Sequence, residues 1–458
     1  MRMLRSGGIV VLVALGTLCA GASSASAQGE PARATSVAAV APLTLPEIIE
    51  YGLRHNPGVR QSAFGVQVAG QGLKAARGER MPRVDLTSGA TAYRYPTPVT
   101  PITGSPLSGA PFPDFDDNIY DFGFLFSLPL YKGGRLDRGA EVARIKQLIA
   151  GHQLEATRQE LAYNLTSTYY KILQLKALAR VSDAQVKELE GLRGQAESFV
   201  KAGGRAPLDL LKADVELARG RENALVVSNS LQTTLELLKK LMGIEDVTRR
   251  IDVAEEQISE KPYLPLDDGL RRAFERRPEY RAVQGRVQAA GEQVKISEGR
   301  RLPSVYATAD YGRRSGDSLA FKENWSAGVR LTLPVFDGGV IRSDIETQRL
   351  ELERAKEEER AVRLSINREV KDAYTELENA ARRLEVTGMA LVPARENRRI
   401  ELLKYQTGAG TMTDNLDAQT VLLRAEYDYY RALFDRETAY AAMKKALGED
   451  VSEEGVSR

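Results

Sequence analysis

The chain is 458 residues long, which is enough for two domain-sized units. Its 64 lysines and arginines nearly balance 62 aspartates and glutamates, so no overall field favours nucleic acid or an acidic partner. A mean hydropathy of -0.32 argues against a bundle of membrane-spanning helices.

The N-terminal residues are typical of a secretory signal peptide, which we predict over residues 1–27. Two arginines precede the apolar run Ile9–Leu15, and Ala25–Ala27 form a small-residue cleavage motif. The apolar run is too short for a retained membrane anchor. Residues 28–42 are expected to form a flexible segment. The only cysteine, Cys19, lies in the signal peptide, so the processed chain would contain no disulfide.

A first structural repeat is predicted over residues 43–243. It opens with a helix over about residues 57–80, which has a proline at its first turn. A hairpin of strands follows over about residues 83–130, where polar and apolar side chains alternate. The proline-free stretch 135–201 predicts a helix about 100 Å long at 1.5 Å per residue. A second helix, over about residues 208–242, returns along it.

The long helical stretch carries an apolar seam on an otherwise charged surface. The seam includes Leu161, Leu165, Tyr169, Ile172 and Leu175. This spacing is typical of coiled-coil packing, so we expect the long helices to pack against other helices.

The chain then repeats itself, after a linker over residues 244–266. Pro57 in His-Asn-Pro matches Pro278 in Arg-Arg-Pro, 221 residues later (278 − 57). Further on, Leu128–Gly134 matches Leu333–Gly339, 205 residues later (333 − 128). Because the same order of elements recurs, the sequence predicts two duplicated halves.

The second repeat is predicted over residues 267–448 and is followed by a C-terminal tail over residues 449–458. The offset between the halves falls by 16 residues (221 − 205), so the first half carries an insertion of this length. The Pro, Gly, Ser and Thr content of Pro96–Pro113 places the insertion there, as a loop. Within the second repeat, Pro393 interrupts the long helical stretch and is expected to kink it.

The second repeat contains a hairpin of its own, over about residues 304–335. Trp325–Leu333 alternates strictly, with the apolar side chains on one face. Strands of about ten residues can cross a bilayer when tilted, although a soluble hairpin with one buried face would show the same alternation. After the signal peptide no apolar run of about 20 residues occurs, so a membrane segment would have to be made of strands.

Two hairpins supply four strands, and four strands cannot close into a barrel. Open edges in lipid leave backbone groups unpaired at several kcal/mol each. Three copies would supply twelve strands, enough for a barrel with a lumen. The fold class predicted from the sequence is therefore mostly α, with a β-barrel part that only an oligomer can complete.

The turns between the paired helices of each half, residues 203–207 and 408–411, would form the tips of two helical hairpins. The chain resembles the TolC family of outer-membrane efflux proteins in these tips, in the repeat order and in the two Pro-x-[Phe/Tyr]-x-Gly-Gly elements. The resemblance covers about residues 43–448. It implies a homotrimer with a 12-stranded transmembrane β-barrel and a long α-helical barrel across the periplasm. It further implies an exit channel in the outer membrane of a Gram-negative bacterium. An inner-membrane transporter and a periplasmic adaptor would be its partners, in tripartite efflux or type I secretion.

The resemblance also implies where the channel is gated. The segment from Tyr405 to Ala418 looks like the family's periplasmic gate, and Asp414 and Asp417 match the two acidic positions that form selectivity rings. In three copies these carboxylates would favour cations. An alternative is that both are ordinary acids at a helix N-terminus, where they oppose the dipole.

The tips depart from the family pattern in one respect. The family prototype has an arginine where this chain has Gly410, and that arginine locks the closed state with a tyrosine, matched by Tyr405, and an aspartate, matched by Asp209. Arg205, on the first tip, is a possible substitute. Asp209 can equally be a helix N-terminal acid.

Glycines mark both tips. Gly203 and Gly408 are predicted to be turn residues with positive φ. With Gly204 and Gly410 they would also bound the surface that contacts the adaptor, as the resemblance implies.

No catalytic pattern accompanies these features. His55 and His152 are the only histidines and have no metal-binding spacing, and nucleotide-binding and nucleophile motifs are missing. We therefore expect no enzyme activity, no cofactor and no metal. The main alternative is a periplasmic coiled-coil scaffold or adaptor that never enters a membrane, which would have no need for two membrane-length hairpins.

Overall fold

The computed structural model describes residues 42–99, 114–246, 248–255, 258 and 262–449. The predicted signal peptide, nearly all of the N-terminal segment and tail, and the centre of the predicted loop insertion lie outside these residues. All of the described residues belong to one compact unit.

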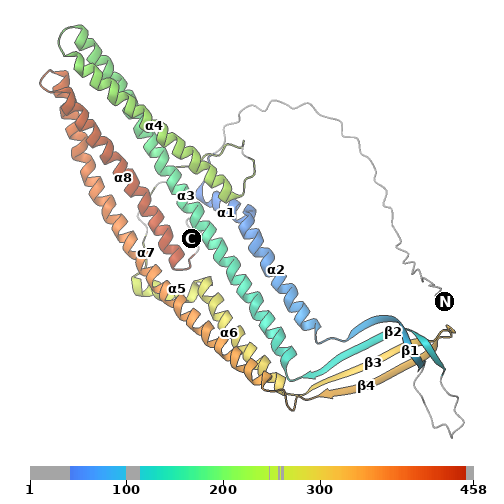
Figure 1. Ribbon diagram of the computed structural model, residues 1–458. Helices are drawn as coiled ribbons and strands as arrows, with labels where there is room; N and C mark the ends of the chain where they lie inside the picture. The colour runs from blue at the N-terminus through green and yellow to red at the C-terminus, as the bar shows by residue number, and fades with distance from the viewer. Residues whose placement is uncertain (1–41, 100–113, 247, 256–257, 259–261, 450–458) are drawn as a thin grey trace, which may run out of the picture. The chain divides into compact units, whose positions relative to one another are not determined.

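The two halves of this unit contain the same elements in the same order (Figure 1). The elements of the first half are α1 (Leu45–His55), α2 (Pro57–Gly78), β1 (Arg83–Pro98), β2 (Phe115–Lys132), α3 (Arg135–Lys201) and α4 (Pro207–Met242). Those of the second half are α5 (Leu266–Arg276), α6 (Pro278–Glu298), the short 3-10 helix η2 (Gly299–Arg301), β3 (Ser304–Ser315), β4 (Lys322–Thr332), α7 (Val340–Gln406) and α8 (Met412–Ala446). Both long helices, α3 and α7, contain 67 residues, which confirms the duplication.

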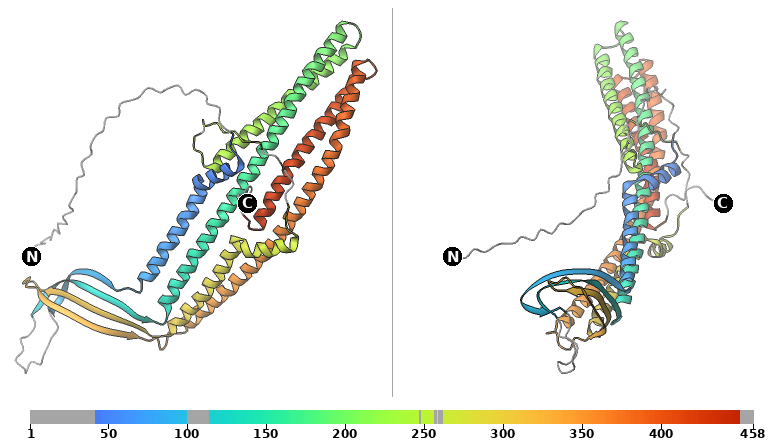
Figure 2. Two further views of the ribbon diagram at one scale, coloured as in Figure 1. Left: turned by 180° about the vertical axis from the view of Figure 1, so that it is seen from behind. Right: turned by 90° about the vertical axis from the view of Figure 1, so that its right-hand side faces the viewer.

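The four strands form one antiparallel sheet in the order β1-β2-β3-β4. The central pair, β2 and β3, joins the two repeats, so β1 and β4 are left as the two edges. The sheet is curved (Figure 2). A bulge between Pro129 and Tyr131 in β2 is consistent with this bending, because a bulge bends the strand that contains it.

The strands of the first hairpin are longer than the predicted ten residues. β1 has 16 residues and β2 has 18, whereas β3 and β4 have 12 and 11. The prediction was wrong here because β1 continues past the end of its counterpart β3 as far as Pro98, inside the predicted insertion, while β2 gains most of its extra length at its other end, where it runs on to Lys132. Loop composition gave no sign of this extension.

The helices pack around α3, which contacts α1, α2, α4, α6 and α8. The predicted seam of α3 is buried: its residues from Leu161 to Ile172 lie in the largest apolar cluster with Ile48 of α1 and Leu238 of α4, and Leu175 is buried outside that cluster. A second cluster joins α5, α6, α7 and α8. Each long helix thus buries one stripe against its neighbours, as coiled-coil spacing predicts.

The predicted interruption at Pro393 does not occur. α7 runs from Val340 to Gln406 as one helix that includes the proline. Proline removes one backbone hydrogen bond and crowds the carbonyl four residues earlier. Leu391 and Ala394 on either side are buried, and this packing holds the helix together across the defect.

The short helices α1 and α5 were not anticipated from the sequence. Thr44 and Glu47 form a capping box at the start of α1, and this pair was the overlooked signal. The described part of the linker between the halves is irregular. Lys176 of α3 anchors it by donating to Asp252 Oδ1 at 2.5 Å. Within the described ranges, no helix is apolar over a length that would cross a bilayer.

Candidate functional site

The sheet has one apolar and one polar face. Residues paired across antiparallel strands point to the same side, and Leu86, Phe124, Tyr311 and Trp325 form one such row. The apolar face comprises Val84, Leu86, Phe122, Phe124, Phe126, Leu128, Val305, Ala307, Ala309, Tyr311, Trp325, Ala327, Val329 and Leu331. Many of these side chains are exposed, so the face suits contact with lipid.

The opposite face is charged and polar. Its rows include Arg83, Asp85, Thr87, Asp121, Ser127, Thr308, Asp310, Arg314, Lys322, Ser326 and Arg330. Such a face suits water, and the alternation along each strand is the pattern of a barrel that separates lipid from an aqueous lumen.

At the other end of the unit lie the tips of the two helical hairpins, α3–α4 and α7–α8 (Figures 1 and 2). Gly203 and Gly408 adopt φ of 73° and 83°, as the tip turns were predicted to require, whereas Gly204 and Gly410 do not have positive φ. A Cβ at Gly410 would lie 2.9 Å from Cβ of Lys404. The turn therefore leaves no room for the arginine found in the family prototype.

Arg205 joins the two tips instead. Its guanidinium lies 5.0 Å from the centre of the Tyr405 ring and donates to the carbonyl oxygens of Tyr405 at 3.2 Å and Gly410 at 3.1 Å. The contact combines a cation–π interaction with two charge-assisted hydrogen bonds. The second tip is thus held by the first within one protomer.

Tyr405 is fully buried in an apolar cluster that both tips share. The cluster consists of Leu189, Leu192, Ala196, Ala213, Leu217, Tyr405 and Met412. Burial and the nearby charge of Asp209 raise the pKa of Tyr405, although Arg205 opposes this. Its hydroxyl has no hydrogen-bond partner among the described residues, so Asp209 acts on Tyr405 through its charge alone.

Asp414 and Asp417 are both exposed near the start of α8, three residues apart and thus on one side of the helix. Asp414 also caps this helix: its Oδ2 accepts from Thr411 Oγ1 at 2.6 Å and from the Thr411 amide at 3.4 Å. The hydroxyl and then the amide hydrogen bond lower the pKa of Asp414. The helix N-terminal role is therefore present in the structure and is compatible with a second role for the same charge.

One polar cluster near the tips was missed from the sequence. Arg398 of α7 is only 5% exposed and donates through Nη2 to Oε1 of Glu188 on α3 at 2.5 Å. Its Nη1 donates to Oδ1 of Asn415 on α8, and Gln419 donates to Glu188 at 3.5 Å. Arg398 of α7 therefore connects α3 of the first repeat with α8 of the second.

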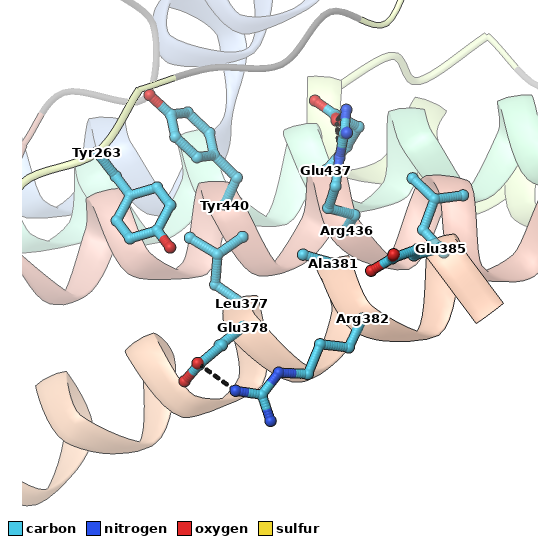
Figure 3. A pocket seen from close by; sticks show the side chains of 10 residues that line it. Tyr263, Leu377, Glu378, Ala381, Arg382, Glu385, Arg436, Glu437 and Tyr440 are labelled. Atoms are coloured by element: carbon cyan, nitrogen blue, oxygen red, sulfur yellow. Dashed lines mark hydrogen bonds and ion pairs between the residues drawn. The ribbon is translucent and has the colours of Figure 1, made fainter.

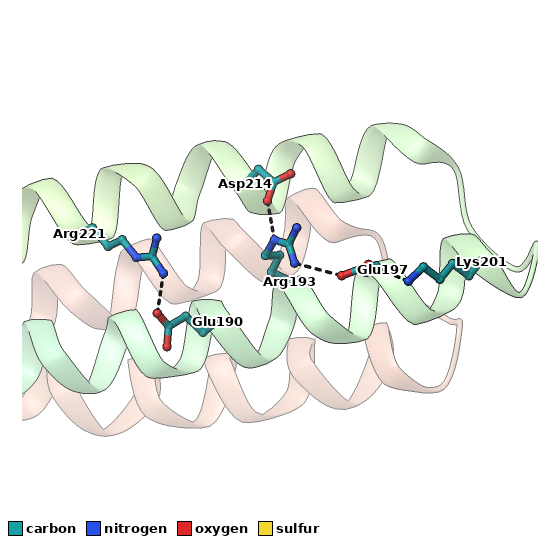
Figure 4. Close-up of polar contacts among 6 residues, drawn as sticks. All are labelled: Glu190, Arg193, Glu197, Lys201, Asp214 and Arg221. Atoms are coloured by element: carbon teal, nitrogen blue, oxygen red, sulfur yellow. Dashed lines mark hydrogen bonds and ion pairs between the residues drawn. The ribbon is translucent and has the colours of Figure 1, made fainter.

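The periodicity of α7 holds the signal that would have revealed this cluster. Leu391, Ala394, Arg398 and Tyr405 are all buried on one stripe, so the arginine occupies a seam position. Its repeat counterpart is Arg193 (398 − 205), which pairs with Asp214 at 2.8 Å and Glu197 at 3.0 Å in the first hairpin (Figure 4). Arg193 is 40% exposed, so the two arginines differ in burial, which the sequence does not reveal.

An apolar groove of about 380 Å³ opens beside the tips. It is lined from α4 by Leu208, Leu211, Lys212, Val215 and Glu216, and from α8 by Thr413, Leu416 and Asp417. The exposed leucines lie within one turn of the glycine turns, so the groove belongs to the same end of the unit.

Comparison with known proteins agrees with this geometry. The family model described as outer membrane efflux protein matches residues 49–244 and 269–449, which correspond to the two repeats. The chain belongs to the outer membrane efflux protein family. Members of this family are outer-membrane channels that extend into the periplasm, and this protein is accordingly located in the outer membrane.

Several members of the family are similar to it over most of their length. Protein CyaE of Bordetella pertussis is 23% identical, with 89% of this chain and 84% of CyaE covered. Outer membrane protein TolC of Escherichia coli is 20% identical, with 88% and 82% covered. The crystal structure of the Campylobacter jejuni CmeC outer membrane channel matches with a TM-score of 0.77 at 16% identity, over 88% of this chain and 85% of CmeC.

This member of the outer membrane efflux protein family also has an open pocket of about 400 Å³ away from the tips (Figure 3). It lies between α7 and α8, beside Tyr263. Glu378 and Glu437, two of its carboxylates, are bonded to Arg382 and Arg436. Among the described residues no cluster of three potential metal ligands occurs. The pocket shows no arrangement of acid, base and nucleophile.

Substitutions at Tyr405 separate the roles of its ring and its hydroxyl. Tyr405→Phe is expected to change the free energy of unfolding by no more than about 0.5 kcal/mol, because the hydroxyl makes no hydrogen bond within the described part of the chain. Tyr405→Ala should cost about 3–5 kcal/mol, because it empties the shared cluster. Thermal unfolding of the two variants measures the difference. A large loss in the phenylalanine variant would show that the hydroxyl has a partner after all.

Proposed function

We propose that this protein is the outer-membrane exit channel of a tripartite efflux or type I secretion system and performs no catalysis. It would pass substrates from an inner-membrane pump and a periplasmic adaptor across the periplasm and the outer membrane. The observation that carries this proposal is the curved sheet with one apolar and one polar face, continuous with helices of 67 residues.

A homotrimer is part of the proposal. The sheet has two unpaired edges, β1 and β4, which in lipid would leave backbone groups without partners. Three copies supply twelve strands, enough for a lumen lined by the polar face. The long helices would continue this lumen through the periplasm, since at 1.5 Å per residue each spans about 100 Å.

The periplasmic end of the channel would be its gate. Three copies of Asp414 and Asp417 place six carboxylates at one end of the helices, which favours cations at a constriction. Arg205 and Tyr405, with the charge of Asp209 nearby, would hold the two tips together in the closed state. This arrangement would take the place of the lock in which the family prototype uses an arginine at the position of Gly410.

The groove beside the tips is the proposed contact for the adaptor. Leu208 and Leu211 are exposed there beside Lys212, Glu216 and Asp417, so an apolar surface is rimmed by charges of both signs. Exposed apolar grooves of this kind are typical of helix-in-groove recognition. The turns that contain Gly203 and Gly204, and Gly408 and Gly410, would bound this contact surface.

Fractionation tests the channel against a periplasmic scaffold. We expect the protein in the outer-membrane fraction, released by detergent and not by salt or alkaline washing. On a gel it should run as a trimer that dissociates on heating, because barrel closure gives each strand a partner. Recovery as a soluble monomer from the periplasm would rule out the channel.

A further inference from the structure

The contact between the two repeats of one protomer provides a template for the contact between neighbouring subunits. Within the protomer, β2 of the first repeat pairs with β3 of the second (Figure 1). The repeat makes β4 the counterpart of β2, and β1 the counterpart of β3. Both counterparts have an unpaired edge. The edges left open are thus the two that the internal template would join.

We propose that β4 of one copy pairs with β1 of the next in a defined register: Phe336 opposite Val84, Leu333 opposite Leu86, and Leu331 opposite Ser88. This inference rests on the proposed trimer and adds its register to it.

The register follows from the pairs observed inside the protomer. Tyr131 pairs with Val305, Leu128 with Ala307, and Phe126 with Ala309. Adding 205 to the β2 residues gives positions 336, 333 and 331. Subtracting 221 from the β3 residues gives positions 84, 86 and 88.

The end of β4 is consistent with a missing partner. β2 continues to Lys132, with Tyr131 and Lys132 both paired to β3, whereas β4 ends at Thr332. The counterpart residues that follow it include Val335 and Phe336, which are 90% and 92% exposed. Pairing with β1 of a second copy would extend β4 and cover these two side chains.

The faces of the sheet agree with the register. Leu86 and Ser88 lie on the same face as Leu331. If β4 is extended beyond Thr332 by pairing with β1 of the next copy, alternation places Leu333 on that side as well. A slip of one residue would place the apolar row of one subunit against the polar row of the next. The proposed register keeps the apolar face continuous from copy to copy.

A close backbone contact at the junction of strands and helices gives independent support. A Cβ at Gly133 would lie 2.3 Å from the carbonyl oxygen of Gly299, so the two repeats touch through glycines. The counterparts are Gly338 (133 + 205) and Gly78 (299 − 221). Neither has any neighbour within 4 Å of an added Cβ. Gly133 and Gly338 have nearly the same φ, 61° and 66°, so the second glycine already has the shape of the first.

Exposed apolar side chains on the helices also lie where the contact between the two repeats predicts a contact between subunits. A Cβ at Gly285 of α6 would lie 2.8 Å from Ile149 and 3.8 Å from Ile145, both on α3. The counterpart of Gly285 is Phe64 of α2, and the counterparts of the two isoleucines are Arg354 and Leu350 of α7. Phe64 and Leu350 are 61% and 64% exposed. Contact of α2 with α7 of the next copy would bury both, and buried apolar area drives such association.

Cysteine pairs test the register directly. The variant Leu333→Cys with Leu86→Cys should form covalent trimers under mild oxidation, on non-reducing gels. It should do so about tenfold faster than pairs of Leu333→Cys with Val84→Cys or Ser88→Cys, whose Cβ atoms would be misaligned. Leu128→Cys with Ala307→Cys is the matched control, because it places the same pair inside one protomer and should yield only a protomer-sized product.

The outcomes separate this inference from the proposed function. Trimers that cross-link fastest at position 84 or 88 would overturn the register and leave the channel intact. Absence of trimers in the unsubstituted protein would overturn both. Chains that carry only one of the two cysteines should form no covalent oligomer. A product from a single cysteine would mean that the same residue of two copies meets, and not that β4 pairs with β1.

A second variant addresses the glycine contact without cysteines. Gly78→Leu has open space in the protomer and should spare its folding, but it should lower the yield of trimer on unheated gels about tenfold by obstructing Gly338 of the next copy. Gly65→Leu is the control, because Gly65 is also open and its counterpart Arg286 is exposed. Equal trimer yields from the two variants would overturn the proposed glycine contact.

Discussion

Replacing Asp414 and Asp417 together with asparagine is expected to reduce the cation preference of the channel roughly tenfold in planar-bilayer recordings. In the proposed trimer, six carboxylates at one constriction would attract cations and repel anions, and asparagine would remove this charge at nearly constant size. The side-chain oxygen of asparagine can still accept the hydrogen bonds from the hydroxyl and the amide of Thr411 that cap α8. The effect should therefore reflect the charge and not a frayed helix.

Asp214→Asn is the control for this experiment. Asp214 is an acid on the first hairpin, where it is paired with Arg193. Its replacement should leave ion selectivity nearly unchanged. Equal effects of the two substitutions would mean that general surface charge, and not an acidic ring, sets the preference.

The pH dependence of the single variant Asp417→Asn isolates Asp414. Hydrogen bonds from Thr411 lower the pKa of Asp414, so its charge persists below the pH at which an ordinary aspartate is protonated. The remaining cation preference should thus survive mild acidification and disappear as the pH falls through the lowered pKa. Loss of preference already near the ordinary aspartate range would contradict this role.

Replacing Glu188 with alanine is expected to loosen the second hairpin from α3 by about 2 kcal/mol. The substitution leaves the guanidinium of Arg398 buried with the side-chain oxygen of Asn415 as its remaining bonded acceptor. If this link favours the closed state, such a loss shifts the closed–open equilibrium about thirtyfold. Channels in planar bilayers should then open spontaneously much more often, and the helices should melt at a lower temperature.

The repeat supplies a matched control for this substitution as well. Asp214→Ala breaks the pair of the counterpart Arg193, but Arg193 is 40% exposed and keeps Glu197 as a partner. Its loss should lower stability far less than the loss of Glu188, because exposed ion pairs contribute little. Similar effects of both substitutions would show that Arg398 contributes no more than an ordinary surface pair.

The duplication of the chain and the alternation of side chains along the strands could be predicted from the amino-acid sequence alone. Matching segments such as Leu128–Gly134 and Leu333–Gly339 occupy equivalent junctions in the structure, where Gly133 and Gly338 share a positive φ. The strict alternation of Trp325–Leu333 likewise predicted the apolar face. Both are periodic signals, which depend on neighbours in sequence and not on distant contacts.

The contacts at the tips could not be predicted in this way. Arg205 was one possible substitute for an absent arginine, and nothing in the sequence placed its guanidinium over Tyr405. For Asp209 the sequence left two roles open, in the gate or as a helix N-terminal acid; the structure places it in the first turn of α4, where its charge also acts on Tyr405. Such pairings depend on how two hairpins 200 residues apart are aligned.

Periodicity and repetition thus establish where the long helices and the two hairpins of strands lie, how many halves there are, and which side of the sheet is apolar. Packing alone settles which charges are buried, as the contrast between Arg398 and Arg193 shows. Two arginines at equivalent repeat positions read alike in the sequence. Their surroundings differ because Glu188, Asn415 and Gln419 come from other helices, and only the folded chain brings these to Arg398.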